Sequence, residues 1–272
     1  MSKIKVRDLF LLGVFFALGA CSQSEQPIEV SEPGQSDASS SAATDTPAAA
    51  TAGLQLQALE WRNIGPFNGG RGTTVVGHPT DKMVFYFGHS SGGLWKTEDA
   101  GTIWEQVGAG QFNYASVGAM AISESNPDIM YVGLGEPQLR QSVSWGDGMY
   151  KSVDGGVTWE HIGLDDALHI ARVRVHPYNP DIVYVASMGH AFGPNEEKGV
   201  FRTQDGGESW ERVLFKNEGT GAIDLIMSPD DPNLLFAALW EFERKAWGAK
   251  TGGPDSGIWR SRDGGDTWED IS

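Results

Sequence analysis

Short apolar runs alternate with polar turns through residues 73–237, and the runs come in pairs. The first run of each pair leads into a turn that combines Pro with Asp or Asn, which is the chemistry of a tight reversal. The first runs span residues 73–76, 117–122, 172–175 and 223–227. The second runs span residues 83–87, 129–132, 182–185 and 234–237. The pattern predicts pairs of β-strands joined by tight turns.

A motif of constant length follows each pair and aligns without gaps in four copies, at residues 93–104, 148–159, 199–210 and 257–268. Its fixed positions are an Asp (Asp99, Asp154, Asp205, Asp263) and a final Trp (Trp104, Trp159, Trp210, Trp268). An Asp carboxylate can accept hydrogen bonds from turn N–H groups, and Gly tolerates positive φ, so the motif predicts a hairpin turn. The alternative is that these aspartates are catalytic or bind metal. A residue repeated in every unit more commonly builds the unit.

A further strand signature, Trp-Glu-x-Ile or Trp-Glu-x-Val, ends each motif, so every unit holds four strands, A to D. The units recur about every 50 residues, a spacing typical of propeller blades. The 36 glycines and 10 tryptophans agree with turns made of Gly and strands anchored by aromatic side chains. The sequence therefore predicts an all-β fold, a β-propeller of four-stranded antiparallel blades with Asp-box turns, of which four are present.

The ends of this region bear on how many blades the ring has. Residues 61–64, Trp-Arg-Asn-Ile, look like a strand D with no strands A to C before them, and the fourth blade already has its own strand D. We expect an incomplete ring whose remaining blades are encoded downstream. The alternative is a small four-bladed ring in which residues 61–64 are a lead-in strand.

The first 53 residues are expected to lie outside the fold. Residues 1–20 combine Lys and Arg with a short apolar core, which is typical of a signal peptide rather than a membrane span. The tetrad Leu-Gly-Ala-Cys that ends at Cys21 resembles the lipobox of bacterial lipoproteins, which implies lipidation of Cys21 and, with Ser22 after it, the outer membrane of a Gram-negative envelope. The alternative is an ordinary secretory signal. Residues 21–53, rich in Ser, Ala, Thr and Pro, predict a disordered tether to a propeller at 54–272.

Composition excludes several classes of site. The 36 acidic residues against 20 Lys and Arg give a formal net charge of −16, which is wrong for a nucleic-acid-binding surface. One cysteine excludes a disulfide framework and a multi-cysteine zinc site. Because no His pair has helical metal spacing, we expect no metal and no cofactor.

Antiparallel order places the B–C and D–A loops on one face and the Asp boxes on the other. The B–C loops at 88–92, 133–147, 187–198 and 240–256 are long and dissimilar, and function concentrates on such loops. Aromatic and charged side chains around a concave surface suit a peptide or a glycan. The alternative is a structural role, in which the charged residues link the long loops to one another through ion pairs and caps. The candidate ligand-binding residues are Arg71, His89, Glu136, Arg140, Trp145, Asp147, His190, Glu196, Glu197, Trp240, Glu241 and Arg244.

Motifs outside the boxes resemble a family of bacterial BNR-repeat exoproteins related to the propeller of sortilin and often labelled glycosyl hydrolases. The motifs are Trp-Arg-Asn-Ile-Gly-Pro (61–66), Asn-Gly-Gly-Arg (68–71), Gly-Glu-Pro (135–137), and residues 91–96, 140–148 and 190–197. Residues 85–95 also resemble xyloglucan-cleaving propellers, which have a catalytic Asp just before a Gly-Gly pair. This chain has Ser90 and Ser91 before Gly92 and Gly93.

These observations predict a lipid-anchored envelope propeller that binds an extracellular peptide or glycan on the long-loop face. One alternative is a glycoside hydrolase whose carboxylate pair is completed by further blades, since such enzymes need two carboxylates at a defined separation. Another is an assembly scaffold that acts through its blade faces.

Overall fold

The computed structural model describes residues 71–272. The predicted signal peptide, Cys21, the tether and the strand-like residues 61–64 lie outside the described residues. The described chain contains 17 β-strands and no α-helix. None of its segments is a helix long and apolar enough to cross a membrane.

The strands form four antiparallel sheets in chain order, each a meander. The first contains β1 (Gly72–Gly77), β2 (Phe85–His89), β3 (Gly93–Thr97) and β4 (Glu105–Val107). The second contains β5 (Val117–Ile122), β6 (Met130–Leu134), β7 (Met149–Ser152) and β8 (Glu160–His161). The third contains β9 (Ile170–Val175), β10 (Val183–Met188), β11 (Lys198–Thr203) and β12 (Glu211–Leu214). The fourth contains β13 (Thr220–Met227), β14 (Leu235–Lys245), β16 (Gly257–Ser261) and β17 (Glu269–Asp270), with β15 (Gly248–Thr251) paired to β14.

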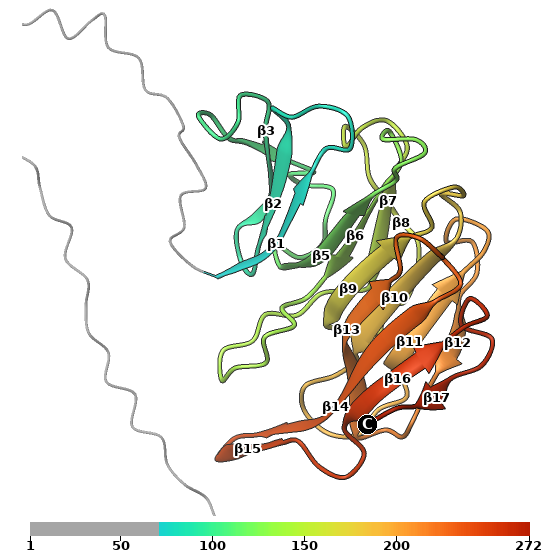
Figure 1. The fold of residues 1–272 in the computed structure, drawn as a ribbon. Helices are drawn as coiled ribbons and strands as arrows, with labels where there is room; N and C mark the ends of the chain where they lie inside the picture. Colours follow the sequence, from blue (N-terminus) through green and yellow to red (C-terminus); the bar gives the residue numbers. More distant parts are fainter. Residues whose placement is uncertain (1–70) are drawn as a thin grey trace, which may run out of the picture. The chain divides into compact units, whose positions relative to one another are not determined.

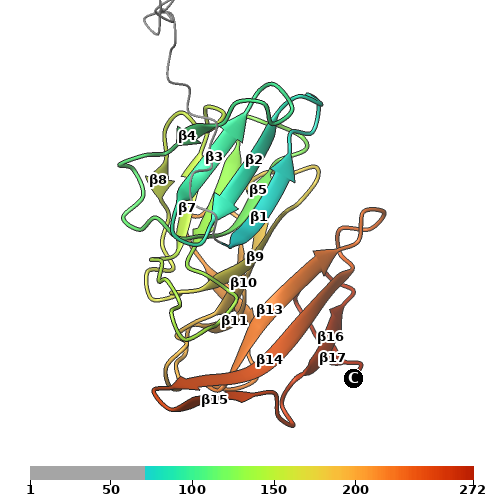
Figure 2. The ribbon, with the colours of Figure 1, turned by 90° about the vertical axis from the view of Figure 1, so that its left-hand side faces the viewer.

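Consecutive sheets pack through their first strands, β1 on β5, β5 on β9 and β9 on β13, as blades do around an axis (Figures 1 and 2). Apolar side chains fill the space between neighbouring sheets rather than one central core. Leu94 and Val132 belong to the cluster between the first and second sheets, and Val200 and Leu235 to the cluster between the third and fourth. Stability therefore depends on each sheet having a neighbour.

A tyrosine on the second strand of three sheets ties each sheet to the next. The hydroxyls of Tyr86, Tyr131 and Tyr184 donate to carbonyls of the following sheet, at Gly155 (3.4 Å), Pro180 (2.9 Å) and Gly264 (2.7 Å). On the neighbouring strand, Lys96, Lys151 and Arg202 lie opposite these tyrosines. The equivalent pair in the fourth sheet is Phe236 with Arg260, so this sheet, unlike the other three, has no tyrosine hydroxyl at that position.

The box aspartates lie in the turns between the third and fourth strands. Asp154 Oδ1 accepts hydrogen bonds from Ser152 Oγ (2.8 Å) and from the backbone N–H groups of Val157 and Thr158, and Oδ2 accepts from Thr158 Oγ1 (2.6 Å). Asp205 and Asp263 make the same hydroxyl contacts. Hydrogen bonds from Thr158 are the main reason why the pKa of Asp154 falls to about 2. These are the contacts of a group that holds a turn.

The box tryptophans also stabilise turns. The indole N–H groups of Trp104, Trp159 and Trp268 donate to the carbonyl of the second box position after Asp, at Gly101, Gly156 and Gly265. Trp210 instead donates to the carbonyl of Ile162 at 2.7 Å, which joins the third sheet to the second.

One segment differs from the sequence prediction. Residues 240–256 were expected to form a loop, but β14 continues to Lys245 and pairs with β15 in a projecting hairpin (Figure 1). The reason is visible in the sequence: Trp240 and Phe242 alternate with Glu241 and Glu243, which continues the strand pattern beyond its predicted end.

Candidate functional site

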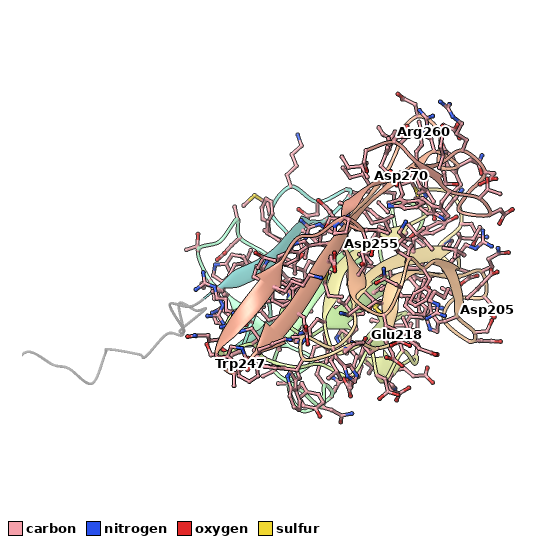
Figure 3. All side chains as sticks on the ribbon, turned by 90° about the horizontal axis from the view of Figure 1, so that it is seen from below. Asp205, Glu218, Trp247, Asp255, Arg260 and Asp270 are labelled. Atoms are coloured by element: carbon pink, nitrogen blue, oxygen red, sulfur yellow. The ribbon has the colours of Figure 1, made fainter. Side chains whose placement is uncertain are left out.

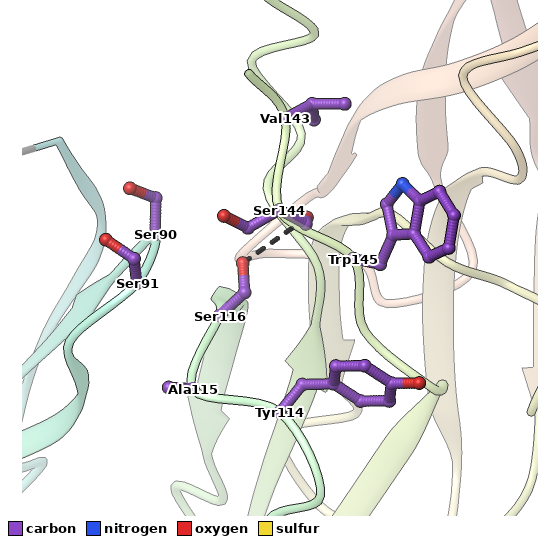
Figure 4. A pocket seen from close by; sticks show the side chains of 8 residues that line it. All are labelled: Ser90, Ser91, Tyr114, Ala115, Ser116, Val143, Ser144 and Trp145. Carbon is purple, nitrogen blue, oxygen red and sulfur yellow. Dashed lines mark hydrogen bonds between the residues drawn. The ribbon is translucent and has the colours of Figure 1, made fainter. Parts of the chain in front are cut away.

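A pocket of about 340 Å³ lies on the long-loop face between the first and second sheets (Figure 4). Its walls come from the β2–β3, β4–β5 and β6–β7 connections, and are lined by Ser90, Ser91, Tyr114, Ala115, Ser116, Val143, Ser144 and Trp145. Trp145 is 51% exposed and Tyr114 is 44% exposed, so both rings present apolar surface to a ligand. The lining combines two aromatic rings with four serine hydroxyls and contains no charged side chain.

An ion pair lies behind this pocket. Glu136 is fully buried, and Arg71 contacts both of its carboxylate oxygens, Nη2 to Oε2 at 2.6 Å and Nε to Oε1. Arg71 Nη2 also donates to the carbonyl of Ser142 (3.2 Å), and the backbone of Glu136 donates to that of Ser144 (2.9 Å). Because buried charges are tolerated when paired and hydrogen-bonded, the pair can fix the β6–β7 loop that carries Trp145.

The turn before Glu136 explains the Gly-Glu-Pro motif. Gly135 has φ of 90°, and a Cβ at this position would collide with the carbonyl oxygen of Leu168. Glycine is therefore required for the backbone to approach Leu168 and to direct Glu136 inward.

Asp147 lies at the C-terminal end of the β6–β7 loop and holds it by hydrogen bonds. Its Oδ2 accepts from Asn113 Nδ2 (2.7 Å) and from the Tyr150 hydroxyl (3.0 Å), and its carbonyl lies 2.6 Å from His161 Nε2. Burial of Tyr150, together with its hydrogen bond to Asp147, raises the pKa of the phenol to about 12. Asp147 thus joins the β4–β5 and β6–β7 connections that flank the pocket.

Three histidines of the long-loop face, His89, His169 and His190, have a buried Nε2 atom. His89 is 1% exposed, and its Nδ1 accepts from the backbone of Ser91 at 3.1 Å. His169 is fully buried, and burial lowers its pKa to about 4, with His190 lowering it further. His169 is therefore neutral at pH 7. Nε2 of each of the three rings lacks a hydrogen-bond partner within residues 71–272.

The remaining candidates lie on the third and fourth sheets. The backbone carbonyl of Glu196 accepts a hydrogen bond from Arg212, and the backbone carbonyl of Glu197 accepts one from Ser187 Oγ. Glu241 pairs with Lys250, Trp240 lies 4.6 Å from Phe242 between ring centroids, and the backbone of Arg244 donates to the carbonyl of Ala191 (2.7 Å). Arg140 is exposed.

The predicted residues therefore form two groups. Trp145 lines the pocket between the first and second sheets, and Arg71, Glu136 and Asp147 are hydrogen-bonded to the connections that form its walls. Glu241 lines a separate pocket of about 200 Å³ with Lys198, which is 1% exposed and whose pKa burial lowers. Sequence reasoning missed Lys198 because a lone Lys beside a repeated Gly gives no signal that it is buried.

Exposed aromatic side chains are concentrated on the long-loop face. Within the described chain, those in its connections are Tyr114, Trp145, Phe192, Phe215 and Trp247, whereas Tyr178 lies in a turn on the opposite face. Trp247, 86% exposed, occupies the tip of the β14–β15 hairpin, and Figure 3 shows it on the other side of the molecule from Asp205 of the third box. Phe192 and Phe215 were not anticipated.

Among residues 71–272, no group of three or more His, Cys, Asp or Glu side chains could hold a metal ion.

Comparison with protein families gives a match to part of the chain. The model of the sortilin family, described as "Sortilin, neurotensin receptor 3", matches residues 147–272. This part of the chain is similar to the sortilin family. The expected resemblance and the predicted all-β propeller fold are thereby confirmed.

Curated relatives of this propeller extend the comparison. Xyloglucanase Xgh74A of Acetivibrio thermocellus is 25% identical over 224 residues, which are 71% of this chain and 24% of the relative. The oligoxyloglucan-reducing end-specific xyloglucanase of Emericella nidulans is 21% identical, over 84% of this chain and 27% of the relative. The chain spans about a quarter of the length of these relatives.

Solved structures show the same fold. An ancestral GH74 enzyme superposes with a TM-score of 0.58 at 23% identity, covering 79% of this chain and 26% of the other. The GH74 xyloglucanase of Xanthomonas campestris gives a TM-score of 0.53 at 18% identity, covering 73% and 29%.

Proposed function

We propose that the sortilin-type propeller binds an extended glycan on its long-loop face, with the pocket between the first and second sheets as one sugar subsite. The observation that carries the proposal is the placement of exposed aromatic rings: Trp145 and Tyr114 lie in one pocket, and the further exposed rings of that face, Phe192 and Trp247 among them, come from the third and fourth sheets.

The pocket chemistry suits a neutral sugar. The apolar face of a pyranose can stack on an indole or phenol ring, while serine hydroxyls both donate and accept hydrogen bonds with sugar hydroxyls. The four serines Ser90, Ser91, Ser116 and Ser144 supply such hydroxyls, and Ser116 already contacts the carbonyl of Ser144 at 3.5 Å (Figure 4). The curated relatives are named as xyloglucanases, which agrees with a polysaccharide ligand.

Binding without cleavage is favoured for the described residues. By the resemblance of residues 85–95 to xyloglucan-cleaving propellers, serine replaces the catalytic Asp just before the Gly-Gly pair at 92–93. No carboxylate lines the pocket. Glu136 lies behind the pocket, but Arg71 contacts both of its oxygens. Because glycoside hydrolysis generally needs an acid and a second carboxylate, this pocket alone lacks the machinery.

The N-terminal segment supports a proposed location for the protein. We propose that lipid on Cys21 anchors the protein to the cell envelope, in the outer membrane, and that the tether holds the propeller above the surface. A glycan-binding face in this position can retain a polysaccharide at the cell surface.

The test is binding of the full-length protein to a panel of immobilised polysaccharides that includes xyloglucan, with reducing-sugar release measured in parallel. We expect retention of at least one polysaccharide without release of reducing ends. Trp145→Ala and Tyr114→Ala should each weaken retention at least tenfold, whereas Tyr178→Ala, an exposed ring on the opposite face, should leave it unchanged. Failure to retain any glycan, or equal loss in all three variants, would refute the proposal. Sugar release would show a hydrolase instead.

A further inference from the structure

A second hollow, of about 330 Å³, lies along the first strands of three sheets rather than among the loops. We call it the axial hollow, because β1, β5 and β9 supply its walls. Its polar lining is Thr73 and Thr74 from β1 with Arg172 and Arg174 from β9, while Ala119 and Met120 come from β5. The axial hollow thus contains two arginines and no carboxylate, in a chain of net charge −16.

The two arginines differ in how they are paired. Arg172 Nε donates to Asp224 Oδ1 on β13 at 2.8 Å, and its Nη1 donates to the carbonyl of Ala171 at 3.0 Å. Arg174 makes a single hydrogen bond, from Nη1 to the carbonyl of Val173 at 3.1 Å, and no carboxylate within residues 71–272 forms an ion pair with it. Burial and the adjacent Arg172 lower the pKa of Arg174, while the nearby Asp224 acts in the opposite direction. Its guanidinium is therefore partly buried, and most of its donors have no partner within residues 71–272.

The hydroxyls beside these arginines also differ. Thr73 Oγ1 lies within hydrogen-bond distance of the carbonyls of Gly88 (3.0 Å) and Val117 (2.6 Å), so its single proton is donated within the first two sheets. Thr74 Oγ1 makes no hydrogen bond with the described part of the chain. The axial hollow consequently offers the free donors of Arg174 and one free hydroxyl, around a net charge of +1 after Asp224 has neutralised Arg172.

We propose that the axial hollow binds a tetrahedral oxyanion, a sulfate or phosphate group carried on a ligand, through Arg174 with Thr74 and Arg172 beside it. Asp224, the carboxylate near Arg174, is hydrogen-bonded to Arg172, so an anion that accepts the remaining donors of Arg174 offsets the cost of its partial burial. The planar fork of Arg matches two oxygens of such an anion, which leaves a further oxygen for the Thr74 hydroxyl. A carboxylate has only two oxygens and satisfies fewer of these donors. This site is separate from the proposed sugar subsite, because no residue lines both hollows.

Calorimetric titration of the full-length protein with sodium sulfate, at constant ionic strength against chloride, tests this site. We expect saturable binding of one sulfate per chain, at least tenfold weaker in Arg174→Gln and weaker by a smaller factor in Arg174→Lys, which keeps the charge but loses the fork. Thr74→Val keeps both arginines and should weaken binding about threefold. The control is Arg262→Gln, an exposed arginine of the fourth box, which should bind as the unmodified protein does.

Sodium acetate in place of sulfate tests the geometry, and should bind at least tenfold more weakly. Thermal melts in chloride establish that each variant is folded. Absence of saturable sulfate binding, equal binding by folded Arg174→Gln and Thr74→Val, or acetate binding as tight as sulfate would overturn the proposal.

Discussion

The guanidinium of Arg71 contacts both carboxylate oxygens of Glu136, and the carboxylate is completely buried. The two residues lie on different sheets, since Arg71 precedes β1 and Glu136 follows β6. Their pairing links the first sheet to the loop that carries Ser144 and Trp145, and so couples the shape of the pocket to the packing between sheets.

Removing only Arg71 should lower the free energy of unfolding more than removing both charges of the ion pair. Arg71→Met leaves the Glu136 carboxylate buried without its partner, and we expect a loss of about 3 kcal/mol in the free energy of unfolding. The double variant Arg71→Met/Glu136→Gln removes both charges and should recover part of that loss. Urea denaturation of the two variants measures the difference. Equal stability of the single and double variants would show that the carboxylate does not depend on Arg71.

The box aspartates should govern stability in acid. The pKa of Asp154 is about 2 in the folded protein, below the value of about 3.9 expected in the unfolded chain, so its contribution is complete above about pH 4 and is lost as the pH falls toward 2. Thr158→Val removes the hydroxyl that donates to Asp154 Oδ2, which raises the pKa of Asp154 and should move acid unfolding to higher pH.

Acid titration followed by tryptophan fluorescence measures this shift, and Thr251→Val, at an exposed position of β15, is the matched control. Coincident acid transitions for Thr158→Val and the unmodified protein would contradict a turn-holding role for Asp154.

The tyrosine contacts between sheets should each contribute modestly. Tyr184→Phe removes the hydrogen bond to the Gly264 carbonyl, but Arg202 Nη1 still donates to that carbonyl at 2.8 Å, so no acceptor is left unsatisfied. We expect a loss of about 1 kcal/mol in chemical denaturation. A loss above about 3 kcal/mol, or none, would mean that the hydroxyl acts otherwise than as a single buried hydrogen bond.

Membrane attachment should depend on one sulfur. Cys21→Ser removes the only cysteine of the chain, and the variant should move from the membrane fraction to the soluble envelope fraction without incorporating labelled fatty acid. The comparison requires the full-length protein expressed in a Gram-negative host. Equal membrane association of the two proteins would refute lipid anchoring at Cys21.

Sequence predicted the blades because their signals are local. Period-two apolar runs, Pro-Asp turns and the box motif each specify structure over a few residues, and β5 has the bounds that its apolar run predicts. The strand β2 begins at Phe85 rather than Met83, because the Met83 N–H donates to Asp81 Oδ1 and so belongs to the turn. Such a side-chain contact has no periodic signature.

The site was less predictable for a physical reason. Loop sequences show which residues are polar but not which pair with which. Glu136 and Arg71 were candidates as ligand-binding groups, yet the structure pairs them with each other. The pocket serines, Lys198 and Arg174 line pockets because of how the sheets and their connections pack. The spacing of residues in the sequence does not encode that packing.

Hydrogen–deuterium exchange of the full-length protein, with and without a saturating polysaccharide from the binding panel, tests most directly where the ligand lies. We predict slower exchange in residues 88–92, 113–116 and 142–147, with unchanged exchange in the box turns at 97–104 and 152–159. Protection confined to the box turns, with none in the pocket connections, would contradict the assignment of the long-loop face as the binding surface.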